Sequence, residues 1–316
     1  WIKSRSTTSN LNLYDSVRGS TKTLISSGND AEDSYANTSD TISSFDADGF
    51  TLGDDSIGYG TNNDGAGMVA WGWKAGGAPS GSLGTIDSST PSGAGTIADT
   101  GNATNIIQSV NQTTGFSITT LSGHNSGITF PHNLGGTPAF VIGKSTNAAM
   151  SWVVWHKDLT ALNALRLNTN VAQAETATGF STAPSSTVIT IGTDDTFGGE
   201  TGKNYVYYAW KAVAGVSAFG SYEGTGGALT VSGLGFTPSF LLIKNIDNAD
   251  NWMLCDKFRG FGSSGNTDGH ELYANWNYAE YASATGITVS NGQFVMNTNN
   301  ANYNYSGHTY VYAAFA

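Results

Sequence analysis

The sequence has few of the residues on which several protein classes depend. Only one of its 316 residues, Cys255, is a cysteine, which excludes an internal disulfide framework and a metal site built on paired cysteines. Charged residues make up only 12%, the net charge is −11, and Lys and Arg form no cluster, so we expect no binding to nucleic acid. No run approaches the roughly 18 consecutive apolar residues of a membrane-spanning helix, so we expect no membrane insertion.

Good helix formers are also scarce, and no long stretch repeats apolar residues with a period of 3.6. The chain is instead rich in glycine, with 41 residues, and in aromatic residues, which make up 11%. This composition is typical of short strands joined by tight turns. We therefore predict an all-β fold, with Cys255 acting as a small buried apolar side chain.

One pattern occurs more than once. Residues 236–244 read as a strand that follows a Thr-Pro pair and ends at Lys244, and residues 136–144 repeat this pattern up to Lys144. The chain opens on a shorter copy that ends at Lys3 and lacks the Thr-Pro lead-in. Long-range self-similarity indicates repeated structural units. We expect three units, and the shortened first copy suggests a fragment of a longer polypeptide.

The repeats divide the chain into four parts. The first unit covers residues 1–77, a Gly/Ser/Thr-rich linker covers 78–114, and the second and third units cover 115–213 and 214–316. Some of the linker is open to strand formation, because residues 105–110 include β-branched side chains. Each unit holds several short strands, which predicts tandem antiparallel β-sandwiches in a row, with a jelly-roll-like form as a possible variant.

Several short motifs in this order resemble a repeat module of tailed-bacteriophage tail fibres and of virion structural proteins from marine phages and prophages. The motifs begin at Leu13 (Leu-Tyr-Asp-Ser-Val-Arg), Gly115 (Gly-Phe-Ser-Ile), Pro131 (Pro-His-Asn-Leu-Gly), Trp152 (Trp-Val-Val-Trp-His) and Phe219 (Phe-Gly-Ser-Tyr-Glu-Gly). The resemblance covers nearly the whole chain.

The resemblance implies a non-enzymatic virion protein that is displayed on the particle, outside the cell, and serves host attachment or fibre structure. It implies no cofactor and no catalytic residues. The expected partners are other copies of the chain, with a trimer by analogy to fibres, other virion proteins, and a glycan on the host surface. A capsid-decorating or purely structural virion protein is one alternative, and a glycan-cleaving tail enzyme is another.

The residues themselves show little sign of catalysis or metal binding. The five histidines are scattered, and no Gly-x-Ser-x-Gly motif is present. Adjacent carboxylates occur at Asp54-Asp55 and Asp194-Asp195, but both pairs stand in loop-like sequence, where solvated turns are more common than catalytic acids. Asp46 and Asp48 precede the first pair and raise calcium as an option, although the spacing does not match an EF-hand. We therefore predict no metal site.

Two Asp-x-x-Arg pairs occupy equivalent places in the repeats, Asp15 with Arg18 and Asp256 with Arg259. A carboxylate at the end of a strand can hold the following turn while a nearby arginine neutralises it. We therefore interpret these pairs as supports of the fold. The second unit has His156 instead of the aspartate, which argues against a shared functional site there.

The feature that most suggests function is aromatic and specific to the third unit. Trp276 and Tyr278 are two residues apart, so in a strand they would share one face, and Tyr303 and Tyr305 repeat this spacing. Tyr281 follows the first pair. Aromatic faces interleaved with asparagine amides suit sugar rings, which offer apolar faces and hydroxyl groups together. We predict glycan or receptor contact at these five residues, with core or inter-subunit packing as the alternative.

Overall fold

The prediction of an all-β chain is confirmed. The computed structural model describes residues 1–34, 40–56, 58–77, 103–176, 178–261, 270–282 and 286–316. Its secondary structure there consists of 25 strands, which all pair antiparallel. Within these ranges no helix has the length and apolarity needed to cross a membrane.

The strands fall into three units, which follow one another along the chain. The first unit holds β1 (Ile2–Ser4), β2 (Asn12–Asp15), β3 (Gly19–Ile25), β4 (Asp33–Ser34), β5 (Ile42–Phe45), β6 (Phe50–Leu52) and β7 (Met68–Ala70). The second holds β8 (Thr104–Asn111), β9 (Phe116–Ser122), β10 (Ile128–Pro131), β11 (Phe140–Ser145), β12 (Val153–His156), β13 (Asn163–Arg166), β14 (Ala174–Glu175), β15 (Val188–Ile191) and β16 (Asn204–Trp210). The third holds β17 (Ser217–Glu223), β18 (Leu229–Ser232), β19 (Phe240–Asn245), β20 (Met253–Asp256), β21 (His270–Tyr273), β22 (Tyr281–Ala282), β23 (Ile287–Ser290), β24 (Gln293–Met296) and β25 (Thr309–Phe315).

Each unit has one large and one small sheet. The large sheets have the orders β4-β3-β2-β1-β7, β14-β13-β12-β11-β16-β9-β8 and β22-β21-β20-β19-β25-β17, so corresponding strands take corresponding places. The small sheets are β5-β6, β10-β15 and β18-β24-β23. In the second and third units, apolar side chains from both sheets form one buried cluster, as in a β-sandwich. The sandwich class is therefore confirmed, whereas the jelly-roll variant stays a prediction.

The large sheets of the second and third units are apolar on both faces. Along β16, the residues that face the small sheet alternate with those that face the opposite way, as expected for a strand. The first set is Tyr205, Tyr207 and Ala209, and the second is Val206, Tyr208 and Trp210; all six are buried. A small sheet covers only one face, so the other face needs another cover.

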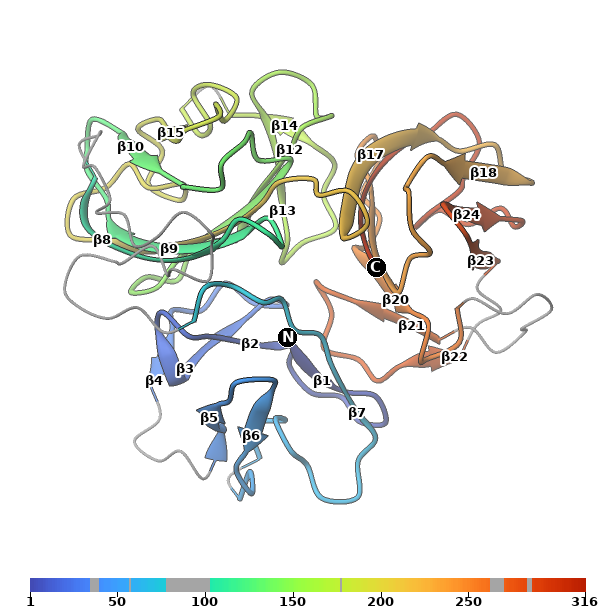
Figure 1. Cartoon of the computed structure of the whole chain (residues 1–316), viewed down its shortest axis with the longest axis horizontal. Coiled ribbons are helices and arrows are strands. Elements are labelled where there is room, and N and C mark those ends of the chain that lie inside the picture. Colours follow the sequence, from blue (N-terminus) through green and yellow to red (C-terminus); the bar gives the residue numbers. More distant parts are fainter. Residues whose placement is uncertain (35–39, 57, 78–102, 177, 262–269, 283–285) are drawn as a thin grey trace.

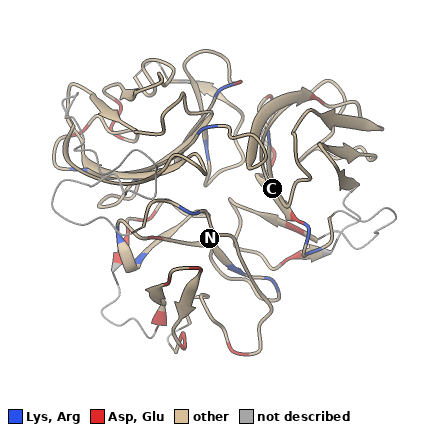
Figure 2. Cartoon of the chain, viewed as in Figure 1, with Lys and Arg blue, Asp and Glu red and all other residues tan. Residues whose placement is uncertain are grey.

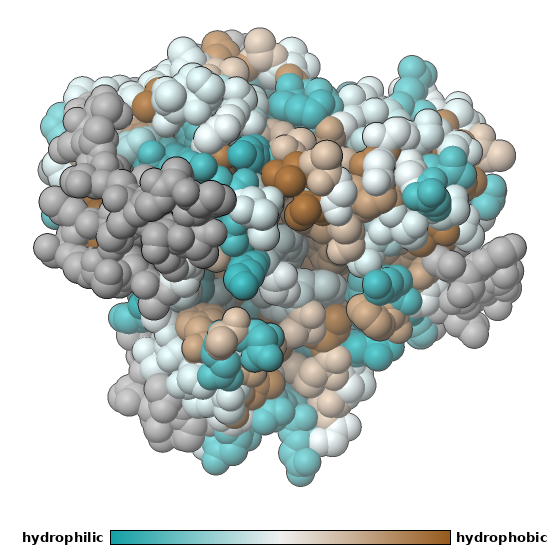
Figure 3. Space-filling view, in the orientation of Figure 1, coloured by the Kyte–Doolittle hydropathy of each residue, from teal (hydrophilic) through white to brown (hydrophobic). Residues whose placement is uncertain are grey.

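That cover is a core that all three units share. It combines side chains such as Leu13 and Trp71 of the first unit, Phe140 of the second, and Phe240 and Leu254 of the third. Figure 1 accordingly shows the units arranged around a centre, and apolar residues line part of the region where they meet in Figure 3. The expected row of separate sandwiches is thus wrong: the apolar face that each small sheet leaves uncovered turns toward the shared core, and this closes the units into a ring.

Three equivalent hydrogen bonds join the units around this ring. The backbone N–H of Glu32 donates to Thr146 O (2.8 Å) and that of Gln173 donates to Ile246 O (3.0 Å). The N–H of Glu280 completes the cycle by donating to Arg5 O, at 2.7 Å. Each bond links one unit to the next, so the chain has pseudo-three-fold symmetry.

Two tryptophans add a second set of bonds between units. Trp152 Nε1–H donates to Ile25 O at 2.9 Å, and Trp252 Nε1–H donates to Arg166 O at 2.8 Å. The first unit has Leu11 at this place, and there Ser26 Oγ–H donates to Ala274 O at 2.8 Å. The junctions are therefore equivalent in position but differ in their side chains.

The repeated lysines Lys3, Lys144 and Lys244 are fully buried. Their ammonium groups donate mainly to backbone carbonyls, and in two cases a carbonyl of the neighbouring unit takes part: Asn277 O for Lys3 (3.3 Å) and Asn170 O for Lys244 (3.2 Å). The pattern that revealed the repeats thus marks the places where the units are joined.

The boundary of the second unit also differs from the prediction. β8 pairs with β9 along the edge of the second large sheet, so residues 104–111 belong to this unit and not to a linker. Their β-branched side chains explain this strand. Residues 78–102 of the expected linker lie outside the described residues.

The three buried lysines predict an unusual dependence of stability on pH. Burial lowers the pKa of each ammonium group to about 8, from an ordinary value of 10.5. The unfolded chain therefore binds more protons than the folded chain between these values, and the free energy of unfolding should rise with pH across this window. Urea unfolding at pH 7.5, 8.5 and 9.5 measures the change.

Replacing Lys244 with methionine should reduce this rise by about a third, because methionine fills the space but does not titrate, whereas Lys3 and Lys144 still do. Lys257→Met, at an exposed lysine, is the matched control and should leave the slope unchanged. A free energy of unfolding that stays constant or falls from pH 8 to 9.5 in the unmodified chain would contradict the prediction. Above pH 10 the buried tyrosines, whose pKa values burial raises, oppose the effect.

Candidate binding surface

Four aromatic side chains of the third unit form a surface cluster, which we name the aromatic patch: Tyr273, Trp276, Tyr278 and Tyr281. The ring centroids of Trp276 and Tyr278 lie 5.2 Å apart, and those of Tyr273 and Trp276 lie 5.5 Å apart, both in edge-to-face geometry. Tyr281 pairs with Glu271 across β21 and β22, next to Tyr273. Trp276, Tyr278 and Tyr281 are 43%, 60% and 64% exposed.

The loop conformation of the patch differs from the expected strand. β21 ends at Tyr273, and Trp276 N–H donates to Tyr273 O in a turn (3.2 Å), so Trp276 and Tyr278 do not share the face of a strand. They meet because the loop folds back onto the neighbouring first unit, where Ser9 N–H donates to Asn277 O at 2.8 Å.

The prediction that Tyr303 lies on the surface and contacts a ligand is wrong. It is only 1% exposed and belongs to the buried cluster between the two sheets of the third unit. Its hydroxyl accepts the N–H of Gly286 (3.1 Å) and bonds the hydroxyl of Thr298 (2.8 Å). The chain turns at residues 301–303, so Tyr303 points inward, whereas Tyr305 is 46% exposed and lies against the ring of His308.

Asparagine amides border the aromatic patch. Asn302 Nδ2–H donates to the hydroxyl of Tyr273 (3.3 Å), and its Oδ1 accepts the N–H of Asn251 (3.1 Å). Asn275 Nδ2–H donates to Asn251 Oδ1 at 2.7 Å. Amide groups therefore stand beside the rings and are held in place by one another.

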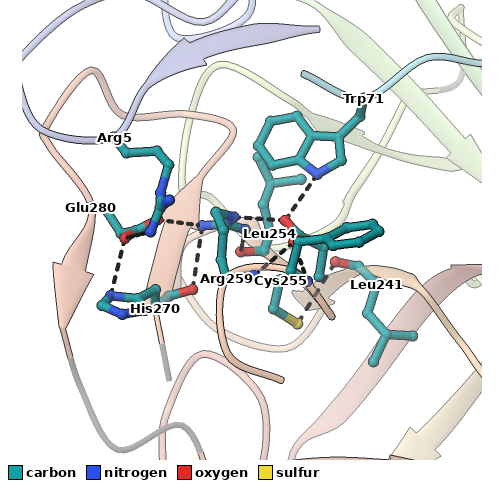
Figure 4. Close-up of polar contacts among 10 residues, drawn as sticks. Arg5, Trp71, Leu241, Leu254, Cys255, Arg259, His270 and Glu280 are labelled. Carbon is teal, nitrogen blue, oxygen red and sulfur yellow. Dashed lines mark hydrogen bonds and ion pairs between the residues drawn. The ribbon is translucent and has the colours of Figure 1, made fainter. Parts of the chain in front are cut away.

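An ion-pair network anchors the loop that carries the patch (Figure 4). The guanidinium of Arg5 binds Glu280 with two parallel hydrogen bonds, Nη2 to Oε1 at 2.8 Å and Nε to Oε2 at 2.9 Å. Arg259 Nη1 lies 3.2 Å from Glu280 Oε2, and His270 Nδ1 lies 3.0 Å from Oε1. Burial raises the pKa of Glu280, but the two arginines outweigh it, so the net pKa lies below the ordinary value. The carboxylate is therefore ionised at neutral pH.

The same network continues to the second Asp-x-x-Arg pair. Arg259 Nε donates to Asp256 Oδ2 at 2.6 Å, and Asp256 Oδ1 accepts the backbone N–H groups of Phe258 and Arg259. Asp256 Oδ2 also accepts Trp71 Nε1–H, at 3.0 Å, from the first unit. The pair thus holds its own turn and joins two units.

The first pair has the same geometry at another junction. Arg18 Nε donates to Asp15 Oδ2 at 2.6 Å, Arg18 Nη1 lies 2.9 Å from Glu32 Oε2, and Tyr208 of the second unit donates its hydroxyl to Asp15 Oδ2 at 2.7 Å. Both arginines are almost fully buried.

His156 takes the place of the aspartate at the third junction. Its Nδ1 accepts the backbone N–H of Asp158 at 3.1 Å. In the same way, the carboxylates of Asp15 and Asp256 accept the N–H of the residue two positions later in the chain. Its Nε2–H donates to Tyr312 O of the third unit, at 3.1 Å. Burial lowers the pKa of His156 to about 4, so the ring is neutral and needs no arginine. The departure from the Asp-x-x-Arg pattern therefore replaces an ion pair with a neutral bridge.

The other candidate side chains serve local structure. Asp55 is buried and accepts the N–H groups of Tyr59, Gly60, Thr61 and Asn62 at 2.7–3.2 Å. Asp46 binds the hydroxyls of two residues of the β5–β6 hairpin, and Asp194 caps a turn through Thr196 N–H. Within the described ranges, no three His, Cys, Asp or Glu residues gather to hold a metal ion. Cys255 is buried and unpaired, as predicted, and burial raises the pKa of its thiol.

Charged residues are few on the ribbon of the whole chain (Figure 2). The support of the patch by Arg5 and Glu280 was not predicted, because it joins residues 275 positions apart in sequence. One signal was present: Glu32, Gln173 and Glu280 stand at equivalent places of the repeats, and each is a junction residue.

Comparison with known proteins gives a family but no named relative. A model described as "Domain of unknown function (DUF7483)" matches residues 1–316, so the chain belongs to this family. No curated protein and no solved structure matches the chain.

The network beneath the patch gives a second prediction. Glu280→Gln removes the negative charge that two arginines share, and it leaves Arg259 buried with Asp256 alone. Loss of one partner from a buried network typically costs on the order of 3 kcal/mol, so we expect a decrease of this size in the free energy of unfolding. Urea unfolding at neutral pH measures it.

Glu200→Gln is the matched control. The Glu200 side chain is 40% exposed and stands 4.0 Å from Lys203, so its replacement should change the free energy of unfolding by no more than about 0.5 kcal/mol. Equal effects of the two substitutions would show that the network does not stabilise the junction.

Proposed function

We propose that the chain is a non-enzymatic appendage protein of a bacteriophage virion, and that its aromatic patch contacts a glycan on the host surface. The observation that carries the proposal is the patch itself: exposed rings in a loop that an ion-pair network and backbone bonds hold against the neighbouring unit. The resemblance of the repeats to tail-fibre modules supports the virion setting.

The chemistry of the patch suits a sugar. A pyranose ring presents C–H groups on one face, which pack on Trp276 or Tyr278, and hydroxyl groups at its edge, which the phenol and amide groups can bind. The rings are held in position before binding, so little conformational entropy would be lost when a ligand binds.

Exposure separates this proposal from a packing role within the chain. An aromatic side chain that stabilises the fold is normally buried, as Tyr303 is, whereas the rings of Trp276, Tyr278 and Tyr281 are at least 43% exposed. Tyr305, which is 46% exposed in another loop of the same unit, supplies a second contact in this proposal.

We also propose that the chain works on the particle surface, outside the cell, together with other copies or other virion proteins. Fibre-like proteins act as assemblies. A trimer of this chain would bring together three copies, each of which is itself a ring of three units. Mass photometry at nanomolar and micromolar concentrations would measure the number of copies, and a particle that stays a single chain at both would overturn the trimer.

The test of the glycan proposal compares binding to purified surface polysaccharides and glycan arrays. Trp276→Ala and Tyr278→Ala should each weaken binding, by up to about tenfold, since an aromatic stacking contact contributes about 0.5–1.5 kcal/mol beyond its buried area. Both side chains are exposed, so the melting temperature should stay within about 2 °C of the original.

Phe45→Ala is the matched control. Phe45 is an aromatic residue that is 40% exposed on the β5–β6 hairpin, and its loss should leave glycan binding unchanged. If the unmodified chain binds no glycan, or if Phe45→Ala weakens binding as much as Trp276→Ala, the patch is not a glycan site.

A further inference from the structure

A second pair of rings lies in the loop that precedes β25. The ring centroids of Tyr305 and His308 are 4.7 Å apart, and both residues are at least partly exposed. β16 and β25 share the sequence Tyr-Val-Tyr, so the equivalent places of the second unit can be counted back from it. Glu200 and Lys203 stand at these places. The third unit therefore has a pair of rings where the second unit has charged side chains.

Asn302 links this pair of rings to the aromatic patch. Its Nδ2–H donates to the hydroxyl of Tyr273, and it stands three positions before Tyr305 in the chain. Because successive Cα atoms are about 3.8 Å apart, the Cα atoms of Asn302 and Tyr305 lie no more than about 11 Å from each other. The two sets of rings are therefore neighbours in the third unit.

Two further asparagines border the rings. Asn248 is exposed, and its Nδ2 lies 3.0 Å from Nε2 of His308. Asn251 follows three positions later, is partly exposed, and donates its backbone N–H to Oδ1 of Asn302 at 3.1 Å. We name the aromatic patch, these three asparagines and the ring pair of Tyr305 and His308 the binding band.

The cations beside the binding band are already bound within the chain. Arg5 and Arg259 both bind the carboxylate of Glu280. Lys3 and Lys244 are fully buried and donate to oxygen atoms of the chain. None of these four side chains is therefore available to bind a negatively charged ligand.

Carboxylates, in contrast, stand on the same stretch of chain as the amides. Asp247 is exposed and Asp250 is partly exposed. Oδ2 of Asp247 accepts the N–H of Thr309, and Oδ2 of Asp250 accepts the side-chain amide of Asn245, both at 2.7 Å. Both donors are neutral and leave the negative charges uncompensated. Like charges that are brought together cost free energy, so the binding band disfavours an acidic sugar.

We propose that the binding band takes a linear, uncharged glycan. One pyranose ring stacks on the aromatic patch and another on Tyr305, and hydroxyl groups between them bind the asparagine amides. This inference rests on the function proposed above and names the class of glycan that the site accepts. Because one ligand makes both contacts, the second contact forms as an intramolecular step, and affinity should increase with glycan length until both sets of rings are covered.

The test measures binding of uncharged and acidic oligosaccharides to the whole chain by calorimetry. The uncharged probes are cello-, malto- and manno-oligosaccharides, from the disaccharide to the hexasaccharide. The acidic probes are oligomers of galacturonate and of mannuronate with the same lengths. The tightest hexasaccharide should be an uncharged one, and it should bind at least about threefold more tightly than its own disaccharide, because it gains a second stacked ring.

Substitutions separate the two sets of rings. Tyr305→Ala should weaken binding of that hexasaccharide about three- to tenfold and leave binding of its disaccharide, which occupies the larger aromatic patch, unchanged. Trp276→Ala should weaken binding of both. Phe45→Ala, at an exposed aromatic residue of the first unit, is the matched control and should change neither.

Two results would overturn the inference and leave the proposed function standing. One is an acidic hexasaccharide that binds more tightly than every uncharged one, and the other is a Tyr305→Ala chain that binds the hexasaccharide as the unmodified chain does. If no uncharged probe binds, the inference is also wrong. Binding on the glycan array then preserves the proposed function, whereas its absence there as well overturns both.

Discussion

The large sheets cannot stand alone, because each has an apolar face that its own small sheet does not cover. A small sheet covers one face, and exposure of the other would leave side chains such as Tyr208, Phe140 and Leu254 in water. Burial of apolar area is the main favourable term in folding, so the three units gain most by turning these faces toward one centre. The ring, the junction bonds and the position of the aromatic loop all follow from this arrangement.

Closing the ring brings charged groups into the interior, and those of Arg18, Arg259 and the three repeated lysines are paired. The guanidinium groups of Arg18 and Arg259 lie between two carboxylates each, and three lysines donate to carbonyl oxygens. At the third junction the neutral ring of His156 does without a counter-ion. Buried charges are costly when one partner is lost, so these junctions tolerate substitution only when a whole set of partners changes together.

The sequence predicts the strand content and the repeats, because alternation and turn residues are local signals. The closure of the ring could not be predicted from the sequence, because it depends on contacts between residues that are far apart in the chain, such as Arg5 and Glu280. The aromatic candidates divide for the same reason: Trp276, Tyr278, Tyr281 and Tyr305 are exposed, but Tyr303 has the same local pattern and turns into the core. Spacing of two residues identifies a shared face only where the chain is a strand.

The three units are parts of one chain, so each has been free to change without the others. At the places of Trp276 and Tyr278, the first unit has Gly28 and Asp30 and the second has Thr169 and Val171. A trimer of identical subunits would present such a patch three times, whereas this ring presents it once. If the patch binds a glycan, one chain is monovalent, and avidity then depends on the number of chains and on their spacing.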